Sequence, residues 1–264
     1  MKYAQEFRAG DEIGRLAPRC AKAITARGFS LIELMLVLTV TVVLTGLLLP
    51  VLTQIKENAF RVMCSSNLRQ IGFGLTTYAD ENNNNLPYSY YGQPGEDKLE
   101  MMAAHRGEGD ALRNWEGIGW LYVKMHLNSA NVFYCPSHDS EHHFERYQNL
   151  YEKYRDMGSA TKPIYTNYQY VGDKDWDNRN KRRRLTDINL VLAADGMRTI
   201  SDINHETGLN MLRADGSVHW KDFASAWQIK MIISRAENGI ANPDNPHVTI
   251  EDEIAEIWKL LGYD

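Results

Sequence analysis

Cysteine is scarce in this sequence: 3 of its 264 residues are cysteines, and no two of them form a C-x-x-C pair. Such a low number excludes a miniprotein held together by several disulfides, and the spacing excludes a zinc ribbon. An excess of basic residues is also missing, because 29 lysines and arginines face 34 aspartates and glutamates, which gives a net charge of -5. We therefore expect no direct nucleic-acid partner.

Familiar enzyme motifs are missing as well. The sequence contains no glycine-rich phosphate loop, no serine hydrolase elbow and no H-E-x-x-H zinc motif. We therefore expect no catalytic residues, no enzymatic activity, no resident metal and no cofactor. Internal repeats are absent, and the 44% of hydrophobic residues is typical of a globular protein rather than a disordered or multi-span membrane protein.

Long apolar runs are absent with one exception, which reads LIELMLVLTVTVVLTGLLLPVL from Leu31 to Leu52. This run has 22 residues and a single charged side chain, that of Glu33. As a helix it would be about 33 Å long, enough to cross a hydrocarbon core of roughly 30 Å. Valine and threonine are frequent in it, but the run is far too long for a strand. We predict a membrane-spanning helix.

The residues before the run predict its orientation. Residues 1–28 hold six basic and three acidic side chains, so we expect the N-terminus in the cytoplasm and everything after residue 53 outside. A secretory signal is the alternative, but its apolar region usually has about 7–15 residues and is followed by a small-residue cleavage site. Neither condition fits well here.

Glu33 is unusual for its position in the run. A carboxylate inside an apolar membrane segment costs about 2.5–3.5 kcal/mol, so it usually has a partner or a role. The alternative is that Glu33 lies at the membrane interface, since it is only two residues into the run.

Residues 27–33, RGFSLIE, and the apolar run behind them resemble the processing site of type IV prepilins and of the pseudopilins of type II secretion. In that family a prepilin peptidase in the membrane cuts after the glycine and methylates the new N-terminal residue. The resemblance implies cleavage between Gly28 and Phe29 and methylation of Phe29. It also implies that the Glu33 carboxylate neutralises the N-terminal amine of a neighbouring subunit during assembly.

The resemblance extends to Pro50, which stands where many pilins have a helix-loosening proline, with Gly46 just before it. It implies a single-pass protein of the bacterial inner membrane whose N-terminus is cytoplasmic and whose head is periplasmic. Such a protein becomes part of a periplasmic or extracellular fibre. The implied partners are the prepilin peptidase, other pilin or pseudopilin subunits, the inner-membrane assembly platform and the lipid bilayer.

Beyond the run, a helical pattern continues to about Asp80. Apolar side chains recur there at steps of three and four and form one helix face: Phe60, Cys64, Leu68, Ile71, Leu75 and Tyr78. The charged side chains of the segment are expected to avoid that face: Lys56, Glu57, Arg61 and Arg69.

Gly72 and Gly74 predict close packing near the end of this helix, and the asparagines at 82–85 should end it. Taken with the prepilin resemblance, these patterns divide the chain into four segments. They are a cleaved leader at 1–28, a transmembrane and assembly helix at 29–53, the second half of the stem helix at 54–82, packed on the head, and a globular head at 83–264.

The head combines strand and helix patterns, with a hairpin predicted around Asp215-Gly216 within residues 208–223. Strands are expected at 131–137, 163–172 and 188–196, and a short helix or strand at 115–124. Helices are expected at 222–239 and after a cap at Thr249. We predict an α+β fold with a long N-terminal helix, an antiparallel sheet in the head and C-terminal helices.

A second resemblance concerns the C-terminal half. His205, nine intervening residues and Asp215-Gly216 resemble the C-terminal signature of a large bacterial group of prepilin-like proteins. Members of that group also show stretches similar to Cys-Ser-Ser-Asn-Leu-Arg-Gln at 64–70 and Cys-Pro-Ser at 135–137. His205 and Asp215 also suggest an acid–base pair, but no nucleophile or oxyanion motif accompanies them. We favour a role for Asp215 in turn geometry and a hydrogen bond from His205 to nearby backbone.

Processing at Gly28 would remove Cys20 and leave Cys64 and Cys135 in an oxidising compartment. A disulfide between them would tie the stem to the head. Two independent buried thiols are the alternative.

Two sets of residues in the head have the composition of metal sites. Cys135, His138, His142 and His143 form a loose zinc-like set, for which we favour a solvated polar loop. The other set mimics a calcium loop and begins with three alternating aspartates: Asp173, Asp175 and Asp177. Asn178 then replaces the turn glycine, Arg184 replaces the closing glutamate, and the basic run 181–184 would oppose a cation. Some pseudopilins bind calcium in their heads, but a mutually neutralising surface loop is the favoured interpretation.

Two functions remain after these considerations. The favoured one is a pilin-like structural subunit, either a pseudopilin or a minor pilin. The alternative is a membrane-tethered enzyme or carbohydrate-binding head, since aromatic side chains stack on sugars although they more often form cores. The aromatic residues that keep this alternative open lie in the head: Tyr88, Tyr90, Tyr91, Trp115, Trp120 and Trp176.

Overall fold

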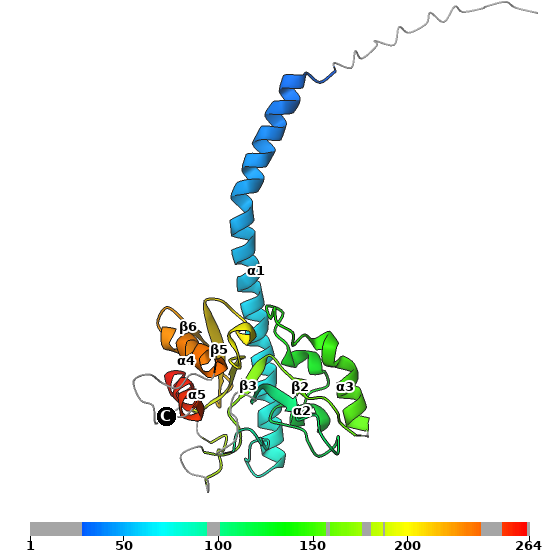
Figure 1. Ribbon diagram of the computed structural model, residues 1–264, viewed down its shortest axis with the longest axis vertical. Coiled ribbons are helices and arrows are strands. Elements are labelled where there is room, and N and C mark those ends of the chain that lie inside the picture. Colours follow the sequence, from blue (N-terminus) through cyan, green and yellow to red (C-terminus); the bar gives the residue numbers. More distant parts are fainter. Residues whose placement is uncertain are drawn as a thin grey trace, which may run out of the picture. The chain divides into compact units, whose positions relative to one another are not determined.

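The computed structural model describes residues 28–93, 101–156, 159–175, 181–186, 188–238 and 250–262. The chain divides into two units, Met1–Pro50 and Val51–Asp264, and helix α1 (Leu31–Glu81) has residues in both. A long N-terminal helix, antiparallel sheets and C-terminal helices follow one another along the chain (Figure 1). The predicted α+β fold is confirmed.

The first unit contains the apolar part of α1. Every described residue from Gly28 to Pro50 is exposed in the single chain, and the helix is long and apolar enough to cross a membrane. Its first turn is a capping box: Ile32 N donates to Ser30 Oγ (3.3 Å), and Ser30 N donates to Glu33 Oε2 (2.9 Å). Glu33 therefore satisfies a backbone donor that the helix itself leaves unpaired.

The threonines of this segment bond back to the helix. Thr41 Oγ1 donates to Leu38 O (2.8 Å), Thr45 Oγ1 donates to Thr41 O (2.7 Å), and Thr39 Oγ1 donates to Met35 O. Such bonds satisfy hydroxyl groups where no water is available. The threonine content is thus compatible with a membrane helix.

Pro50 lies inside α1, four residues after Gly46. Because proline has no N–H, it cannot donate to the Gly46 carbonyl, and one helical hydrogen bond is missing. Both residues are nevertheless helical, and the helix continues to Glu81. The helix therefore accommodates the loss of this bond and does not end at Pro50; local loosening there stays a prediction.

The second half of α1 forms part of the core of the second unit. Cys64, Leu68, Ile71 and Leu75 are fully buried, as the apolar pattern predicts. The helix ends at Glu81, and the asparagines that follow take the left-handed conformation, with φ of 56° at Asn83 and 61° at Asn84. The predicted end of the helix is confirmed.

The two glycines near this end allow close packing, as expected. A Cβ at Gly72 would lie 2.9 Å from Cδ1 of Leu212, and one at Gly74 would lie 3.1 Å from Cγ of Leu127. Leu212 belongs to strand β5 (Gly208–Arg213) of the larger antiparallel sheet, whereas Leu127 follows α2 (Gly119–Val123). In the second unit, α1 therefore runs between the sheet and the segment that holds α2 (Figure 1).

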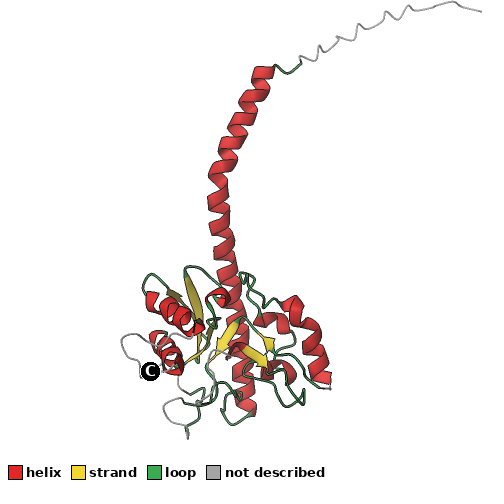
Figure 2. Ribbon diagram, viewed as in Figure 1, coloured by secondary structure: helices red, strands yellow, loops and turns green. Residues whose placement is uncertain are grey.

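The strands form two antiparallel sheets (Figure 2). The smaller sheet pairs β1 (Ala103–His105) with β2 (Ile164–Tyr165). The larger sheet has the order β3-β4-β5-β6, with bounds Tyr168–Tyr170, Val191–Asp195, Gly208–Arg213 and Val218–Asp222. The predicted hairpin around Asp215-Gly216 is the β5–β6 connection.

The single strand predicted at 163–172 is wrong in one respect, because it is divided between β2 and β3, which belong to different sheets. The chain changes sheets at Thr166 and Asn167, both buried. Thr166 Oγ1 donates to Met102 O (3.0 Å), so side chains satisfy backbone groups where the ladder is interrupted.

The strand predicted at 131–137 is also wrong. Its first half is a 3-10 helix, η2 (Ala130–Phe133), which begins where Ser129 Oγ accepts a hydrogen bond from Asn131 N. That cap favours a helical turn over an extended chain. Residues 115–124, left open between helix and strand, contain α2.

Four further helical segments follow η2 among the described residues. They are α3 (Phe144–Asp156), which the sequence patterns did not predict, the short η3 (Ile200–Asp202), α4 (Trp227–Glu237) and α5 (Ile250–Leu260). Helix α4 starts later than expected because residue 222 still belongs to β6. The expected cap at Thr249 lies outside the described residues.

Helix α3 buries an aromatic face at steps of four and three, formed by Tyr147, Tyr151 and Tyr154. The Tyr151 ring lies 5.1 Å from that of Tyr122 and 5.9 Å from that of Trp115, centre to centre. This aromatic cluster belongs to the same hydrophobic core as the buried face of α1 and the residues of the large sheet.

Candidate functional site at the Cys64–Cys135 disulfide

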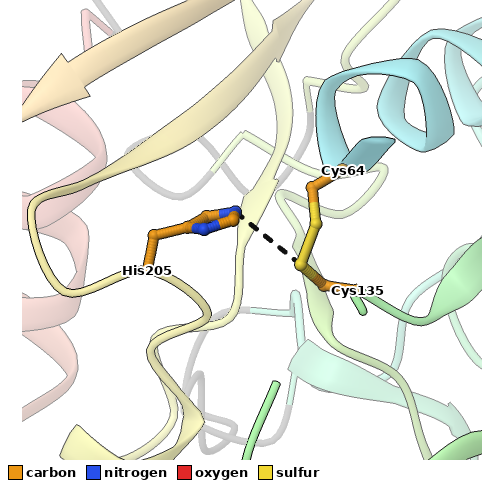
Figure 3. Close-up of side chains that lie close together, drawn as sticks. All are labelled: Cys64, Cys135 and His205. Carbon is orange, nitrogen blue, oxygen red and sulfur yellow. Dashed lines mark hydrogen bonds between the residues drawn. A yellow bond between two sulfur atoms is a disulfide. The ribbon is translucent and has the colours of Figure 1, made fainter. Parts of the chain in front are cut away.

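Cys64 of α1 and Cys135, which follows η2, are joined by a disulfide (Figure 3). Their Cα atoms are 5.3 Å apart and the sequence separation is 71. The two residues are 0% and 4% exposed. Of the two alternatives that the sequence left open, the structure therefore contains the disulfide, which ties the stem helix to the head.

His205 packs against this disulfide. Its Nε2 lies 3.7 Å from Cys135 Sγ, and its Nδ1 donates to Oε1 of Glu57 at 2.6 Å. The His205 side chain is 0% exposed. The expected hydrogen bond from His205 to nearby backbone is wrong, since its partner is a carboxylate from a distant part of the chain.

Glu57 was expected to avoid the buried face of α1, and this too is wrong. A spacing of seven residues is about two helical turns, so Glu57 lies on the same side of the helix as Cys64. The Glu57 side chain is 35% exposed, and its second oxygen accepts a hydrogen bond from Ser137 Oγ at 2.8 Å. One carboxylate thus binds both the Cys-Pro-Ser segment and His205.

Arg61 completes this side of the helix. Its guanidinium lies 3.4 Å from the ring centre of Trp220, a residue of β6. Burial lowers the pKa of Arg61, while the carboxylates of Asp222, Asp195 and Glu57 raise it. The arginine was expected on the solvated face, but it packs on the sheet.

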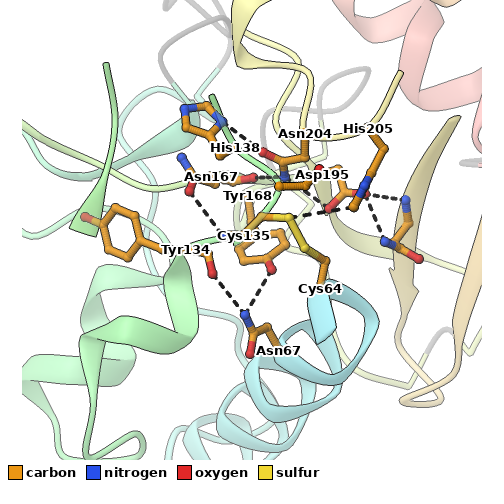
Figure 4. The surroundings of a disulfide bond; sticks show 12 residues. Cys64, Asn67, Tyr134, Cys135, His138, Asn167, Tyr168, Asp195, Asn204 and His205 are labelled. Atoms are coloured by element: carbon orange, nitrogen blue, oxygen red, sulfur yellow. Dashed lines mark hydrogen bonds and ion pairs between the residues drawn. A yellow bond between two sulfur atoms is a disulfide. The ribbon is translucent and has the colours of Figure 1, made fainter. Parts of the chain in front are cut away.

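Amide side chains hold the backbone around the disulfide (Figure 4). Asn67 Nδ2 donates to Tyr134 O (3.0 Å) and to the Tyr168 hydroxyl (3.3 Å). Cys135 N donates to Oδ1 of Asn167 at 3.0 Å. Two asparagine side chains therefore hold the backbone at Tyr134 and Cys135 by bonds other than the disulfide.

Asp195, at the end of β4, lies behind His205. It is 0% exposed, and its Oδ2 is 3.8 Å from His205 Nε2. The same oxygen accepts from Asn210 N (2.6 Å) and Asn210 Nδ2 (3.1 Å), while Oδ1 accepts from Asn204 Nδ2 (3.2 Å). Burial raises the pKa of Asp195, and the nearby His205 and these donors lower it.

Strand β5 separates His205 from Asp215: His205 lies before the strand and Asp215 lies after it. Asp215 is exposed, and its Oδ1 accepts from Ser217 N (2.8 Å) and Ser217 Oγ (2.6 Å), which lowers its pKa. Gly216 has a φ of +80°, a conformation that favours glycine. Asp215 and Gly216 thus shape the turn, as expected, while His205 lies in the core.

The zinc-like set is not brought together. Cys135 is bonded to Cys64, and His143 is exposed. His138 and His142 instead lie near a shared buried carboxylate, with Nε2 atoms 3.9 Å and 3.8 Å from Oδ1 of Asp202. Burial lowers the pKa of both histidines. They form a separate buried cluster rather than the expected solvated loop.

The calcium-like aspartates bind protein groups where they are described. Asp173 is buried and accepts from Ser89 N (3.1 Å) and Gln93 Nε2 (3.0 Å). Asp175 pairs with Lys181 at 3.1 Å, in line with a neutralised loop. Arg184, at the place of the closing ligand, forms an isolated β-bridge with Asn85. Asp177 and Asn178 lie outside the described residues.

Glu116 is a buried carboxylate that the sequence analysis missed. Both of its oxygens accept hydrogen bonds, from Ser89 Oγ (2.5 Å) and from Tyr90 N (2.9 Å) among others. Burial raises the pKa of Glu116 from 4.5 to about 7, against the effect of these donors. The sequence feature that could have indicated this buried carboxylate is the single glutamate within the aromatic stretch WEGIGW.

The aromatic residues considered for sugar binding differ in exposure. Trp115 is buried in the core, whereas Tyr88 is 45% exposed. Tyr90, Tyr91 and Trp120 are half-buried, and Trp176 lies outside the described residues. At the other end of the chain, Phe29 is 84% exposed, and no heavy atom lies within 4 Å of a Cβ built on Gly28.

A sequence model of a protein family described as a protein of unknown function (DUF1559) matches residues 53–189, more than half of the chain. The matched stretch includes Glu57, Cys64 and Cys135 and ends before His205. No curated protein and no solved structure matches the chain.

Proposed function

Since the chain belongs to the DUF1559 family, whose members are pilin-like proteins of unknown function, we propose that it is a structural subunit of a fibre. In this proposal prepilin peptidase cuts between Gly28 and Phe29 and methylates Phe29. The apolar helix then holds the protein in the inner membrane until an assembly platform packs it with other pilin or pseudopilin subunits. The fibre is a type II secretion pseudopilus or a type IV pilus-like fibre.

The observation that carries the proposal is the uncovered apolar surface of α1. Leu31 is 79% exposed and Leu47 is 67% exposed in the single chain, and the side chains between them are exposed as well. A soluble monomer rarely leaves such a surface in water. In a pilin-like subunit, lipid covers this apolar surface while the subunit is in the membrane. The equivalent helices of neighbouring subunits cover it after assembly into the fibre.

The position of Glu33 supports the assembly step. Its carboxylate lies in the first turn of α1 and accepts the backbone N–H of Ser30. Cleavage after Gly28 would create a new ammonium group at Phe29, four residues before Glu33. A neighbouring subunit's ammonium group would attract this carboxylate strongly in a medium of low dielectric constant, although desolvation offsets part of the gain.

A pair of substitutions separates the charge of Glu33 from its capping role. Glu33→Gln keeps an oxygen that accepts from Ser30 N, whereas Glu33→Ala removes both the acceptor and the charge. We expect both variants to be processed and neither to enter fibres. Intact mass measurement reports the loss of residues 1–28 and the added methyl group, and electron microscopy of sheared cells reports fibres.

The control is Glu81→Gln, which removes an exposed charge at the other end of the same helix and should leave fibres unchanged. Normal fibres from Glu33→Gln would contradict the assembly role. An N-terminus that is not cut after Gly28 in the wild-type protein would contradict the processing step.

A further inference from the structure

We propose that Cys64, Cys135 and His205 form a redox-gated zinc site. In the dithiol form the two thiolates and the imidazole bind one Zn²⁺ ion, and the disulfide closes the site. This inference does not depend on fibre assembly, because all three residues lie in the second unit.

The three ligand atoms are already close together. Among the residues that the structure describes, one Sγ from each cysteine and a ring nitrogen of His205 lie within 4.8 Å of one another, and all three residues are buried. Tetrahedral zinc has Zn–S and Zn–N distances of about 2.3 Å and about 2.0 Å, which place sulfur and nitrogen roughly 3.6 Å apart. The distance from His205 Nε2 to Cys135 Sγ is 3.7 Å.

The hydrogen bonding of His205 also suits a metal ligand. In the zinc-bound form Nδ1 keeps its hydrogen bond to the Glu57 carboxylate (2.6 Å), and Nε2, which faces Cys135 (Figure 3), offers its lone pair to the metal. Histidine ligands of zinc typically donate their second N–H to a carboxylate in this way.

Asp195 lies beside this ligand set but outside it, because among the described residues the group of ligand atoms within 4.8 Å of one another contains no carboxylate. Its Oδ2 lies 3.8 Å from His205 Nε2, and both of its oxygens are oriented by asparagine donors. Two thiolates and one imidazole are a protein ligand set that zinc accepts, with water in the fourth position.

Reagents can approach from a cavity of about 330 Å³ beside the disulfide, whose lining includes Met63, Asn67, Cys135 and His138. The reductant is a thiol, RSH. Two RSH molecules break the Cys64–Cys135 bond, form one R–S–S–R disulfide and leave two Cys thiols. Binding of Zn²⁺ then releases both thiol protons, because thiolate is the ligand.

Cobalt(II) tests the site because its thiolate complexes are coloured. The full chain in detergent is reduced with dithiothreitol, freed of reductant under nitrogen and titrated with Co²⁺. We expect thiolate-to-cobalt charge-transfer absorption that saturates at one ion per chain and is displaced by Zn²⁺. The disulfide form should show none.

Variants identify the ligands. His205→Asn should weaken Zn²⁺ binding and alter the cobalt bands, and Glu57→Gln should weaken binding by about 10–100-fold. His219→Asn, which changes an exposed histidine of β6, should bind like the wild type. Circular dichroism of the disulfide forms verifies that each variant folds. If His205→Asn does not fold, the Zn²⁺ affinity of Glu57→Gln tests the proposal instead. Absence of the charge-transfer band in the reduced wild type, or equal Zn²⁺ affinity in wild type and Glu57→Gln, would overturn the proposal.

Discussion

Glu57 and His205 are 148 positions apart in the chain, and their side chains meet at 2.6 Å. The other oxygen of Glu57 binds Ser137, and Cys64 lies two helical turns along the same helix. One carboxylate of the stem helix therefore connects three stretches that are separate in the sequence. The disulfide and the histidine act as parts of one cluster around it.

The disulfide should be a major contributor to the stability of the second unit. Closing a loop across a sequence separation of 71 restricts the unfolded chain and is worth about 4 kcal/mol in the loop-entropy estimate. We therefore expect the double variant Cys64→Ser, Cys135→Ser to lose about 4 kcal/mol of unfolding free energy. Denaturant titration in detergent, followed by tryptophan fluorescence, measures this loss.

The third cysteine provides the control for that experiment. Cys20→Ser should leave the unfolding curve unchanged, because residue 20 takes no part in the disulfide. A wild-type curve that does not respond to reductant would show that the bond contributes nothing to stability.

Stability should also depend on pH through Glu116. Its pKa is about 7 in the folded protein, against 4.5 for an ordinary glutamate. Between these values the folded state keeps a proton that the unfolded state releases, so stability falls as pH rises from about 4.5 to about 7 and is level above that. Each tenfold change in proton affinity is worth about 1.4 kcal/mol, so the whole fall is about 3 kcal/mol.

Glu116→Gln isolates this effect from other titrating groups. The difference in unfolding free energy between the wild type and the variant should favour the wild type most at pH 4.5 and decline towards pH 7. Asp173, whose pKa burial also raises, remains in both proteins and largely cancels. A difference that does not change with pH would show that Glu116 titrates alike in both states.

Leu68 and Phe73 test the two sides of the stem helix within the second unit. Leu68 is 0% exposed and Phe73 is 71% exposed. Leu68→Ala should lose about 3 kcal/mol by leaving a cavity in the core, whereas Phe73→Ala should change stability by less than about 0.5 kcal/mol. Thermal unfolding by circular dichroism compares them, and similar losses for both would contradict the buried face described here.

Most of the fold was predictable where local patterns decide structure. The apolar run, the spacing of Cys64, Leu68 and Ile71, and the Asp215-Gly216 turn each specify their element by periodicity or backbone preference. The strand predicted at 131–137 failed because a single serine cap at Ser129 outweighs a β-branched and aromatic composition. Helix α3 was missed because its buried face consists of tyrosines. The many charged residues between them make the helical spacing of the tyrosines hard to recognise in the sequence.

The candidate site was only partly predictable. Cys64, Cys135 and His205 were singled out by their motifs, but their common neighbour Glu57 was assigned to the wrong face. Counting seven residues back from Cys64 would have placed Glu57 correctly, because two turns return a helix to the same side. The contacts to Asn167 and Asp195 depend on how distant strands meet, and local pattern does not contain that information.

The disulfide also gives the chain a covalent ring between residues 64 and 135. A single break of the backbone anywhere inside this ring opens it without dividing the molecule. The apolar first part of α1 and the C-terminal half, including His205 and the β5–β6 hairpin, would then stay attached to each other through two sulfur atoms. A protein nicked by a protease in this stretch would run as one species without reductant and as two with it.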